Sequence, residues 1–212
     1  MTYVRITTVA AVLLLAACGP AATQNPPAVG ADTAEIPVGY GTLRRDEIAV
    51  RFQTDQLDIQ VLPLHEGVIR LLAPDTYRSL RQLIQSQQEA IERAARSVNA
   101  LRPSLVMVTF SGVVPQARFV PDDVNITSRG RLYRPLAIVP LSPQWSSQQI
   151  DPRQQATAIY LFDDGIAFRE ALTVTYQRLS NDAWSGSVRL LEREHARVLT
   201  RAQAAPAPPP DD

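Results

Sequence analysis

Few side chains in this sequence could perform acid–base, nucleophilic or metal chemistry. The chain has two histidines, His65 and His195, a single cysteine, Cys18, and no lysine. One cysteine cannot form an intramolecular disulfide or a cysteine-based zinc site, and two histidines cannot form a three-histidine site. A lysine Schiff base is excluded. A histidine beside a carboxylate is the remaining acid–base candidate, and we predict no metal and no other cofactor.

One arginine stripe stands out near the C-terminus. It consists of Arg189, Arg193, Arg197 and Arg201. Residues four apart lie on one face of a helix. Guanidinium groups suit phosphates, so this face could contact the anionic headgroups of lipid or lipopolysaccharide. The alternative, which we favour at this stage, is a solvated face whose arginines pair with Glu192, Glu194 and acids elsewhere.

The overall composition is that of a folded protein without a strong long-range electrostatic field. The 212 residues include 45% hydrophobic residues, and 21 basic side chains balance 21 acidic ones. Nucleic-acid-binding proteins usually carry a basic excess, so a nucleic-acid partner is disfavoured. The length suits a single domain with tails, which can be stable through its core without a disulfide.

The N-terminus has the pattern of a secretory signal. Arg5 carries a positive charge, residues 6–15 form an apolar run, and the small residues Ala16 and Ala17 precede Cys18. The run is too short for a transmembrane helix, which needs about 20 residues. Residues 1–17 are therefore predicted to be a signal peptide.

The stretch Leu15-Ala16-Ala17-Cys18 resembles the lipobox of bacterial lipoproteins. This resemblance implies cleavage before Cys18, a diacylglycerol on its sulfur and a further fatty acid such as palmitate on its amino group. Two or three acyl chains anchor a protein stably. Gly19 takes the place of the aspartate that retains enterobacterial lipoproteins at the inner membrane. The resemblance thus implies a lipid-anchored protein of the cell envelope, on the outer membrane and facing the periplasm.

Low-complexity segments are predicted on both sides of one globular domain, which we place at residues 38–203. Residues 18–37 are rich in Ala and Pro and are expected to form a flexible tether. Such a tether places the domain about 20–25 Å from its anchor. Residues 204–212 are predicted to be a disordered Pro-rich tail.

Alternation of apolar and polar residues predicts half-buried strands over most of the domain. These segments are 48–52, 57–61, 124–127, 132–133 and 172–176. Residues 105–110 and 156–162 are more apolar and are predicted to be central strands. Pro135, Pro140 and Pro143 indicate an edge or crossing segment.

Two segments have helical periodicity instead. A long helix is predicted at about 75–101, with Asp75 as N-cap and Arg102-Pro103 as the stop. A C-terminal helix is predicted at about 187–202, with Val188, Leu191, His195 and Val198 inward. The fold class expected is therefore mainly β with helices (α+β).

Segment 106–176 resembles the immunoglobulin-like antiparallel β-sandwich domains of bacterial surface lipoproteins. The resemblance is carried by the central strand at 106–110, the Pro121-Asp122-Asp123 strand entry, the Ser128-Arg129-Gly130 turn and the strands at 133–135, 158–162 and 172–176. It implies an antiparallel sandwich. The long helix before this segment and the helix after it depart from the resemblance, so we expect a sandwich with an inserted long helix and a C-terminal helix.

Three functions remain open. The one we expect is a membrane-anchored envelope lipoprotein whose domain acts in binding or structural support without catalysis. Its expected partners are membrane lipid and an envelope protein. The alternatives are an envelope hydrolase with an atypical His/carboxylate site and a periplasmic carrier of lipid or a small apolar ligand. The hydrolase requires His65 or His195 beside a carboxylate, and the carrier requires an apolar cavity.

Overall fold

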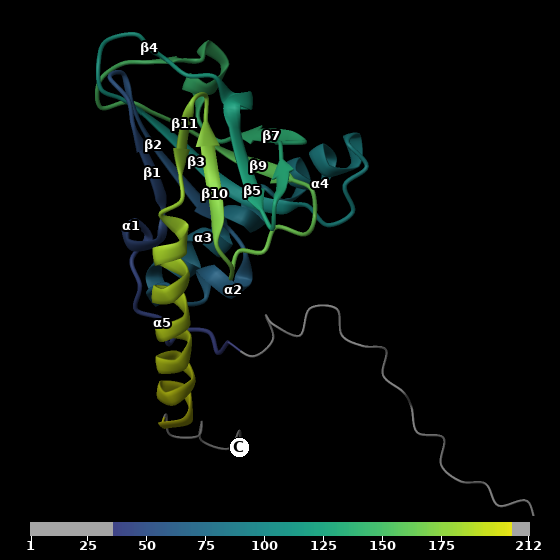
Figure 1. Cartoon of the computed structure of the whole chain (residues 1–212). Coiled ribbons are helices and arrows are strands. Elements are labelled where there is room, and N and C mark those ends of the chain that lie inside the picture. The colour runs from purple at the N-terminus through teal and green to yellow at the C-terminus, as the bar shows by residue number, and fades with distance from the viewer. Residues whose placement is uncertain (1–35, 205–212) are drawn as a thin grey trace, which may run out of the picture. The chain divides into compact units, whose positions relative to one another are not determined.

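The computed structural model describes residues 36–204, and the predicted signal peptide, Cys18 and most of the tether lie outside them. The described part is α+β, with mostly antiparallel strands and a C-terminal helix (Figure 1), as the sequence predicts. It contains a five-stranded sheet, a four-stranded sheet and a two-stranded ribbon.

The larger sheet has the order β1-β2-β3-β9-β7, with every neighbouring pair antiparallel. Its strands are β1 (Val50–Gln53), β2 (Leu57–Pro63), β3 (Ser104–Gly112), β9 (Gln155–Phe162) and β7 (Ala137–Pro140). The predicted central segments are indeed the central strands β3 and β9. The proline-flanked β7 lies at the edge.

The smaller sheet has the order β11-β10-β5-β6. Its strands are β5 (Val124–Ser128), β6 (Arg131–Tyr133), β10 (Leu172–Tyr176) and β11 (Leu179–Asn181). Arg129 and Gly130 both have positive φ, which is typical of a tight hairpin turn, and they join β5 to β6 as the sequence predicts. The ribbon pairs β4 (Ala117–Arg118) with β8 (Gln149–Ile150).

An aromatic cluster fills the space between the two sheets. The Phe110 ring lies 4.7 Å from that of Phe119 and 5.7 Å from that of Tyr176, centroid to centroid. Trp145, in the 3₁₀ helix Pro143–Ser147, packs on both phenylalanines. The Tyr160 hydroxyl donates to the Pro121 carbonyl over 2.9 Å, so its polar atom is satisfied within the core. We call these side chains the aromatic core.

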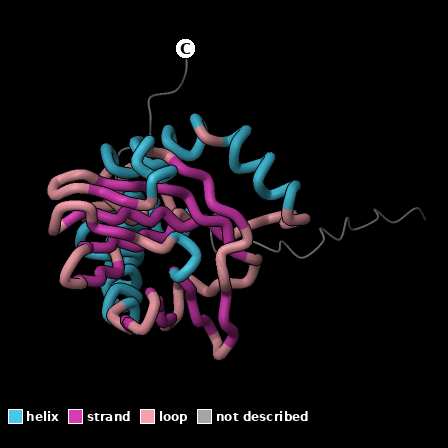
Figure 2. Tube along the Cα trace, turned by 90° about the horizontal axis from the view of Figure 1, so that it is seen from above, coloured by secondary structure: helices cyan, strands magenta, loops and turns pink. Residues whose placement is uncertain are grey.

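The other face of the larger sheet is covered by helices (Figure 2). Leu62, Met107 and Ile159 are in register across β2, β3 and β9 and are buried there. Because neighbouring strand residues point to opposite faces, these central strands are apolar on both sides. This explains the near-continuous apolar runs of β3 and β9.

The long helix predicted at 75–101 is wrong in its continuity and its ends. It is split into α3 (Pro74–Ser86) and α4 (Gln88–Ser97), with Gln87 between them at φ −103° and ψ 5°. Polar side chains at 85–88 provide no apolar contact across the break, and Ser86 bonds back to the Leu83 carbonyl. Asn99, at φ 55°, supplies the left-handed residue that terminates α4.

The start of α3 also differs from the prediction. Ala73 is the N-cap and Pro74 the first helical residue, so Asp75 lies in the first turn. A carboxylate there is favoured by the helix dipole even though it does not cap the helix. Two further helices are single turns, α1 (Arg45–Ile48) and α2 (Glu66–Ile69).

The C-terminal helix α5 (Trp184–Ala204) begins three residues earlier than predicted and extends beyond the sheets (Figure 1). Trp184 is fully buried, and its Nε1 donates to the Phe168 carbonyl over 3.1 Å. Leu191 and Val198 are buried as expected, but the third buried position is Glu194, whereas His195 is only partly buried. The predicted inner stripe is therefore correct at Leu191 and Val198, but Glu194 takes the buried position predicted for His195.

Candidate functional site

The described part of the chain brings its two histidines to one region, the junction between α5 and the rest of the domain. His65 precedes α2, and its Nδ1 accepts a hydrogen bond from the Gly67 amide over 3.2 Å. Its ring lies 5.8 Å from the ring of Phe168. The adjacent Arg169 places its Nη2 3.0 Å from Nδ1 of His195 on α5. The segment Phe168–Arg169 thus lies against both histidines.

Glu194 is the centre of this junction, and only 1% of its surface is exposed. Its Oε1 accepts from the backbone amide and the hydroxyl of Thr42, over 2.9 and 2.8 Å, and from Arg201 Nη1 over 2.9 Å. Arg197 lies 3.8 Å from Oε2. Burial acts to raise the pKa of Glu194, but the hydrogen bonds from Arg201 and Thr42 outweigh it, so this pKa lies below its ordinary value.

Thr42 belongs to a segment, residues 36–44, that we call the N-terminal strap. The strap runs beside α5, where Arg201 also donates to the Tyr40 carbonyl. Gly41 approaches the backbone of Leu71 so closely that a Cβ would lie 2.4 Å from the Leu71 carbonyl carbon. The strap is therefore fixed between α5 and the residues that follow α2. We call Glu194, Arg201, Thr42 and Tyr40 the strap clamp.

A second carboxylate, Glu66, is held in a similar way. It accepts from Arg70 Nε over 2.7 Å and from Arg81 Nη1 over 2.8 Å, and the Tyr77 hydroxyl lies 3.4 Å away. The hydrogen bond with Glu66 raises the pKa of Arg70 despite partial burial. Arg70 also donates to the Ile36 carbonyl over 3.1 Å. Glu66 thus fixes the beginning of the strap through Arg70.

The surroundings of Glu194 do not suit a general base. A general base must be within hydrogen-bond reach of the proton that it removes, and its pKa should lie near the working pH. The carboxylate of Glu194 is stabilised as the anion by guanidinium and hydroxyl donors. Among residues 36–204, no three His, Cys, Asp or Glu side chains converge as metal ligands would.

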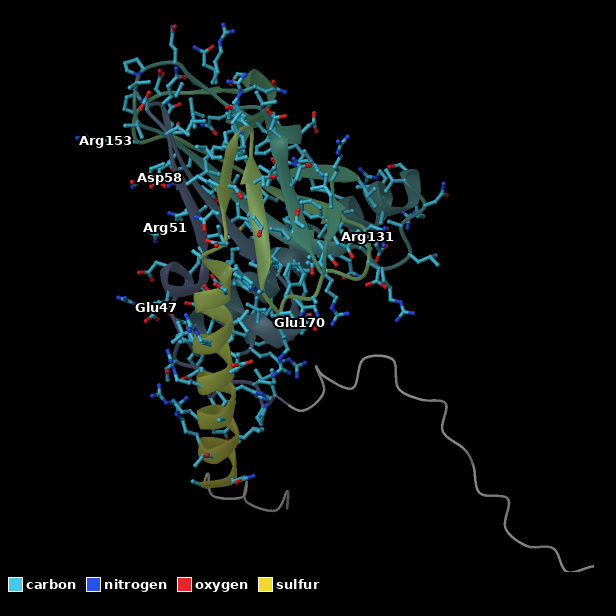
Figure 3. All side chains as sticks on the ribbon, in the orientation of Figure 1. Glu47, Arg51, Asp58, Arg131, Arg153 and Glu170 are labelled. Carbon is cyan, nitrogen blue, oxygen red and sulfur yellow. The ribbon has the colours of Figure 1, made fainter. Side chains whose placement is uncertain are left out.

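The four arginines of the predicted stripe divide into two pairs. Arg197 and Arg201 pair with Glu194 at 3.8 and 2.9 Å. Arg189 and Arg193 are exposed, and no ion pair to either is found within residues 36–204. Side chains ending in nitrogen project from α5 into the solvent (Figure 3). Pairing with Glu194 thus accounts for half of the stripe.

Two open grooves lie elsewhere on the domain. One of about 520 Å³ lies on the outer face of the smaller sheet, where its lining includes Asp122, Asn125 and Arg134. Another, of about 510 Å³, lies at the ends of the β1–β2 and β10–β11 hairpins and is lined by Asp55, Arg178 and other polar residues. Both grooves are open and lined mainly by polar or charged residues, whereas a carrier of an apolar ligand requires an enclosed apolar cavity.

The remaining surface carries exposed ion pairs (Figure 3). Arg131 Nη2 lies 2.6 Å from the Asp163 carboxylate, and Arg129 pairs with Glu170. The Glu170 pKa is lowered by its hydrogen bond from Arg129. Exposed pairs of this kind are common on protein surfaces and point to no ligand.

The sequence predicted Glu194 as an ion-pair partner of the stripe arginines, but it missed the burial of Glu194 and missed Thr42 altogether, although a signal for the burial was present. Glu194 lies three residues after Leu191 and four before Val198, so it shares their helix face. No comparable signal marked Thr42, because it contacts Glu194 only after folding. Cys18, the predicted lipidation site, lies outside the described residues.

No protein-family model matches this chain, and no curated protein or solved structure is significantly similar to it. Within residues 36–204, no helix is both long enough and apolar enough to cross a membrane.

Proposed function

We propose that the chain is a lipid-anchored protein of the bacterial cell envelope whose folded domain binds a partner or supports a structure without catalysis. The observation that carries the proposal is the strap clamp. The segment that would follow the tether is held against α5 by Glu194 and Arg201 through a buried carboxylate. A joint of this kind would keep the root of the proposed tether in one place on the domain.

The anchor would be Cys18, with the diacylglycerol on its sulfur and an acyl chain on its amino group. The lipobox-like stretch 15–18 at the end of a signal-like segment supports this. Gly19 favours the outer membrane and a periplasmic domain. The other partner would be an envelope protein.

An envelope hydrolase is less well supported. Nδ1 of His65 accepts from Gly67, and Nδ1 of His195 lies at hydrogen-bond distance from Arg169. Each contact uses the Nδ1 atom of one histidine. His65 thereby caps the start of α2, and His195 joins α5 to Arg169, which are structural tasks. A carrier of lipid or small apolar ligands is also less well supported, because the grooves described above are open and do not enclose a ligand.

The immunoglobulin-like relationship of the two sheets belongs to the same proposal. It is supported by two antiparallel sheets that enclose one aromatic core. A solved lipoprotein domain with the same strand order, superposing on residues 106–176, would support the relationship. A consistently different order in such domains would contradict it.

The anchor is tested by Cys18→Ser in the native host, followed by separation of membranes from soluble periplasm. We expect the unsubstituted protein in the membrane and Cys18→Ser in the soluble fraction, because the lipid is the proposed grip on the bilayer. Ala22→Ser, a change of similar size beyond the lipobox, is the matched control and should remain in the membrane.

Mass spectrometry of the native protein provides the second readout. A mature N-terminus at Cys18 carrying the mass of acyl chains is expected, whereas an unmodified thiol or an uncut precursor would refute the anchor. The binding role is tested by purifying the full chain from detergent-extracted membranes. One stoichiometric envelope protein is expected, and its absence after mild cross-linking would count against the binding role.

A further inference from the structure

The face of α5 directed away from the domain is basic. Arg189 and Arg193 are exposed one turn apart, and 64% of the Arg197 side chain is exposed on the next turn. Glu192 is the single acid among the exposed positions of α5. The chain as a whole has no net charge. An excess of positive charge is therefore concentrated on this face, which we call the basic face.

The basic face is held outward by the contacts on the opposite side of the helix. Trp184, Leu191 and Val198 are buried, and Glu194 is fixed to Thr42. The orientation of α5 about its own axis is thereby determined, so its arginines lie on one outward face before binding and only their side chains remain to be ordered. Pre-organisation of this kind lowers the cost of binding.

The predicted anchor brings this face close to a bilayer. Cys18 precedes Ile36 by 18 residues, and a flexible chain of that length spans about 20–25 Å. The strap then leads from Ile36 to Tyr40, which Arg201 of α5 contacts. Helix α5 has 21 residues and is therefore about 31 Å long, comparable with the reach of the tether.

We propose that the basic face of α5 docks on the surface of an anionic bilayer, with guanidinium groups on lipid phosphates and other anionic headgroup oxygens. This inference rests on the lipid anchor proposed above, which would keep the face at a high local concentration near the membrane. Guanidinium groups suit phosphate oxygens through paired hydrogen bonds. The helix would lie along the bilayer surface without inserting, since its exposed side is polar.

The docking surface is tested with the full chain carrying Cys18→Ser, so that no acyl anchor contributes to binding. Vesicles of zwitterionic lipid, with or without anionic phosphatidylglycerol, are sedimented with the protein. We expect binding to the anionic vesicles alone, and loss of binding at high salt because exposed charges are screened. Each arginine near an anionic surface strengthens binding roughly fivefold, so Arg189→Gln with Arg193→Gln should weaken it about 25-fold.

A matched control removes the same charge from another helix. Arg93 and Arg96 are exposed on α4, and their double replacement by Gln should leave vesicle binding unchanged. Circular dichroism and thermal unfolding of both double variants verify that each is folded. Equal weakening by the two pairs, or no binding to anionic vesicles, would overturn the proposal.

A third arm distinguishes lipid from free phosphate. Inorganic phosphate is added to the vesicle mixture at an ionic strength matched with chloride. Equal release by the two salts is the expected result for a membrane surface, whereas selective release by phosphate would replace the proposal with a soluble-anion site. Since all arms lack the acyl anchor, their outcome is independent of the mass spectrum at Cys18, and the two proposals can fail separately.

Discussion

The aromatic core and the strap clamp are both buried, yet they are held together by different forces. In the aromatic core, Phe110 contacts Phe119, Trp145 and Tyr176 through ring faces and edges. In the strap clamp, Glu194 is surrounded by hydrogen-bond donors from Thr42 and Arg201. Apolar burial scales with area and has little directionality, whereas the clamp requires particular atoms at particular distances.

This difference suggests that the two regions have different roles. The aromatic core carries no charge in the acid and neutral range, so its contribution there does not depend on pH. The clamp contributes through a charged group, and it fixes one geometry between the strap and α5, because a buried carboxylate is costly unless its donors are in place. Stability is thus expected to depend mainly on the first region, and the position of the tether root on the second.

The largest effect should come from Phe110→Ala in the aromatic core. Phe110 is fully buried, so the truncation leaves a cavity and removes three ring contacts. We expect the free energy of unfolding, measured by urea denaturation, to fall by about 3–5 kcal/mol. Leu132→Ala is the control, because Leu132 is 52% exposed and its truncation should change stability by about 0.5 kcal/mol or less. Similar losses in the two variants would refute the assignment of the core.

A smaller effect is expected from Glu194→Gln in the strap clamp. The amide keeps the shape of the side chain but loses the charge that faces Arg201. We expect a loss of about 1–3 kcal/mol in the free energy of unfolding. Glu192→Gln, two positions away on the exposed side, should be close to neutral.

The effect of Glu194→Gln should depend on pH. Because the folded-state pKa of Glu194 is lowered, its ionised form stabilises the fold fully above the ordinary glutamate pKa of about 4.3. That contribution is lost as the pH falls from there through the lowered pKa. The difference between Glu194→Gln and the parent chain should therefore shrink in acid, while that of Phe110→Ala should not. A pH-independent difference for Glu194→Gln would mean that its charge is not what stabilises the clamp.

The smallest effect should come from Arg129→Ala at the β5–β6 turn. Its pair with Glu170 is exposed on both sides, with side-chain exposures of 64% and 49%. Solvent and salt screen such a pair, so the urea midpoint should be unchanged within error at low and at high salt. A salt-dependent shift would show that this surface pair contributes more than its exposure suggests.

Much of the β structure follows from local patterns in the sequence. Alternation in 57–61 and 172–176 marks β2 and β10, and the apolar runs mark the central strands β3 and β9. These patterns are reliable because each strand must present an apolar face to a common core. The prediction of a single helix over 75–101 was wrong. The apolar spacing continues across residues 85–88, but no core contact there requires the two halves to share one straight axis.

The strap clamp could be predicted only in part. The helical stripe that contains Leu191 and Val198 also contains Glu194, yet a charged residue is almost never fully buried without a partner. That partner, Thr42, lies 152 residues earlier in the chain. No local periodicity connects the two positions, so the burial of Glu194 becomes apparent only when the strap is placed beside α5.

The edge strand β7 limits how the larger sheet could pair with the sheet of another molecule. Leu141 donates to Thr157 of β9, so by alternation Ile138 and Pro140 turn their backbone groups outward. Proline has no amide hydrogen, and Ile138 is therefore the only residue of the pair able to donate to an incoming strand. Neighbouring copies that meet along this edge would find only one of its two outward residues able to donate, so pairing of sheets through β7 is disfavoured.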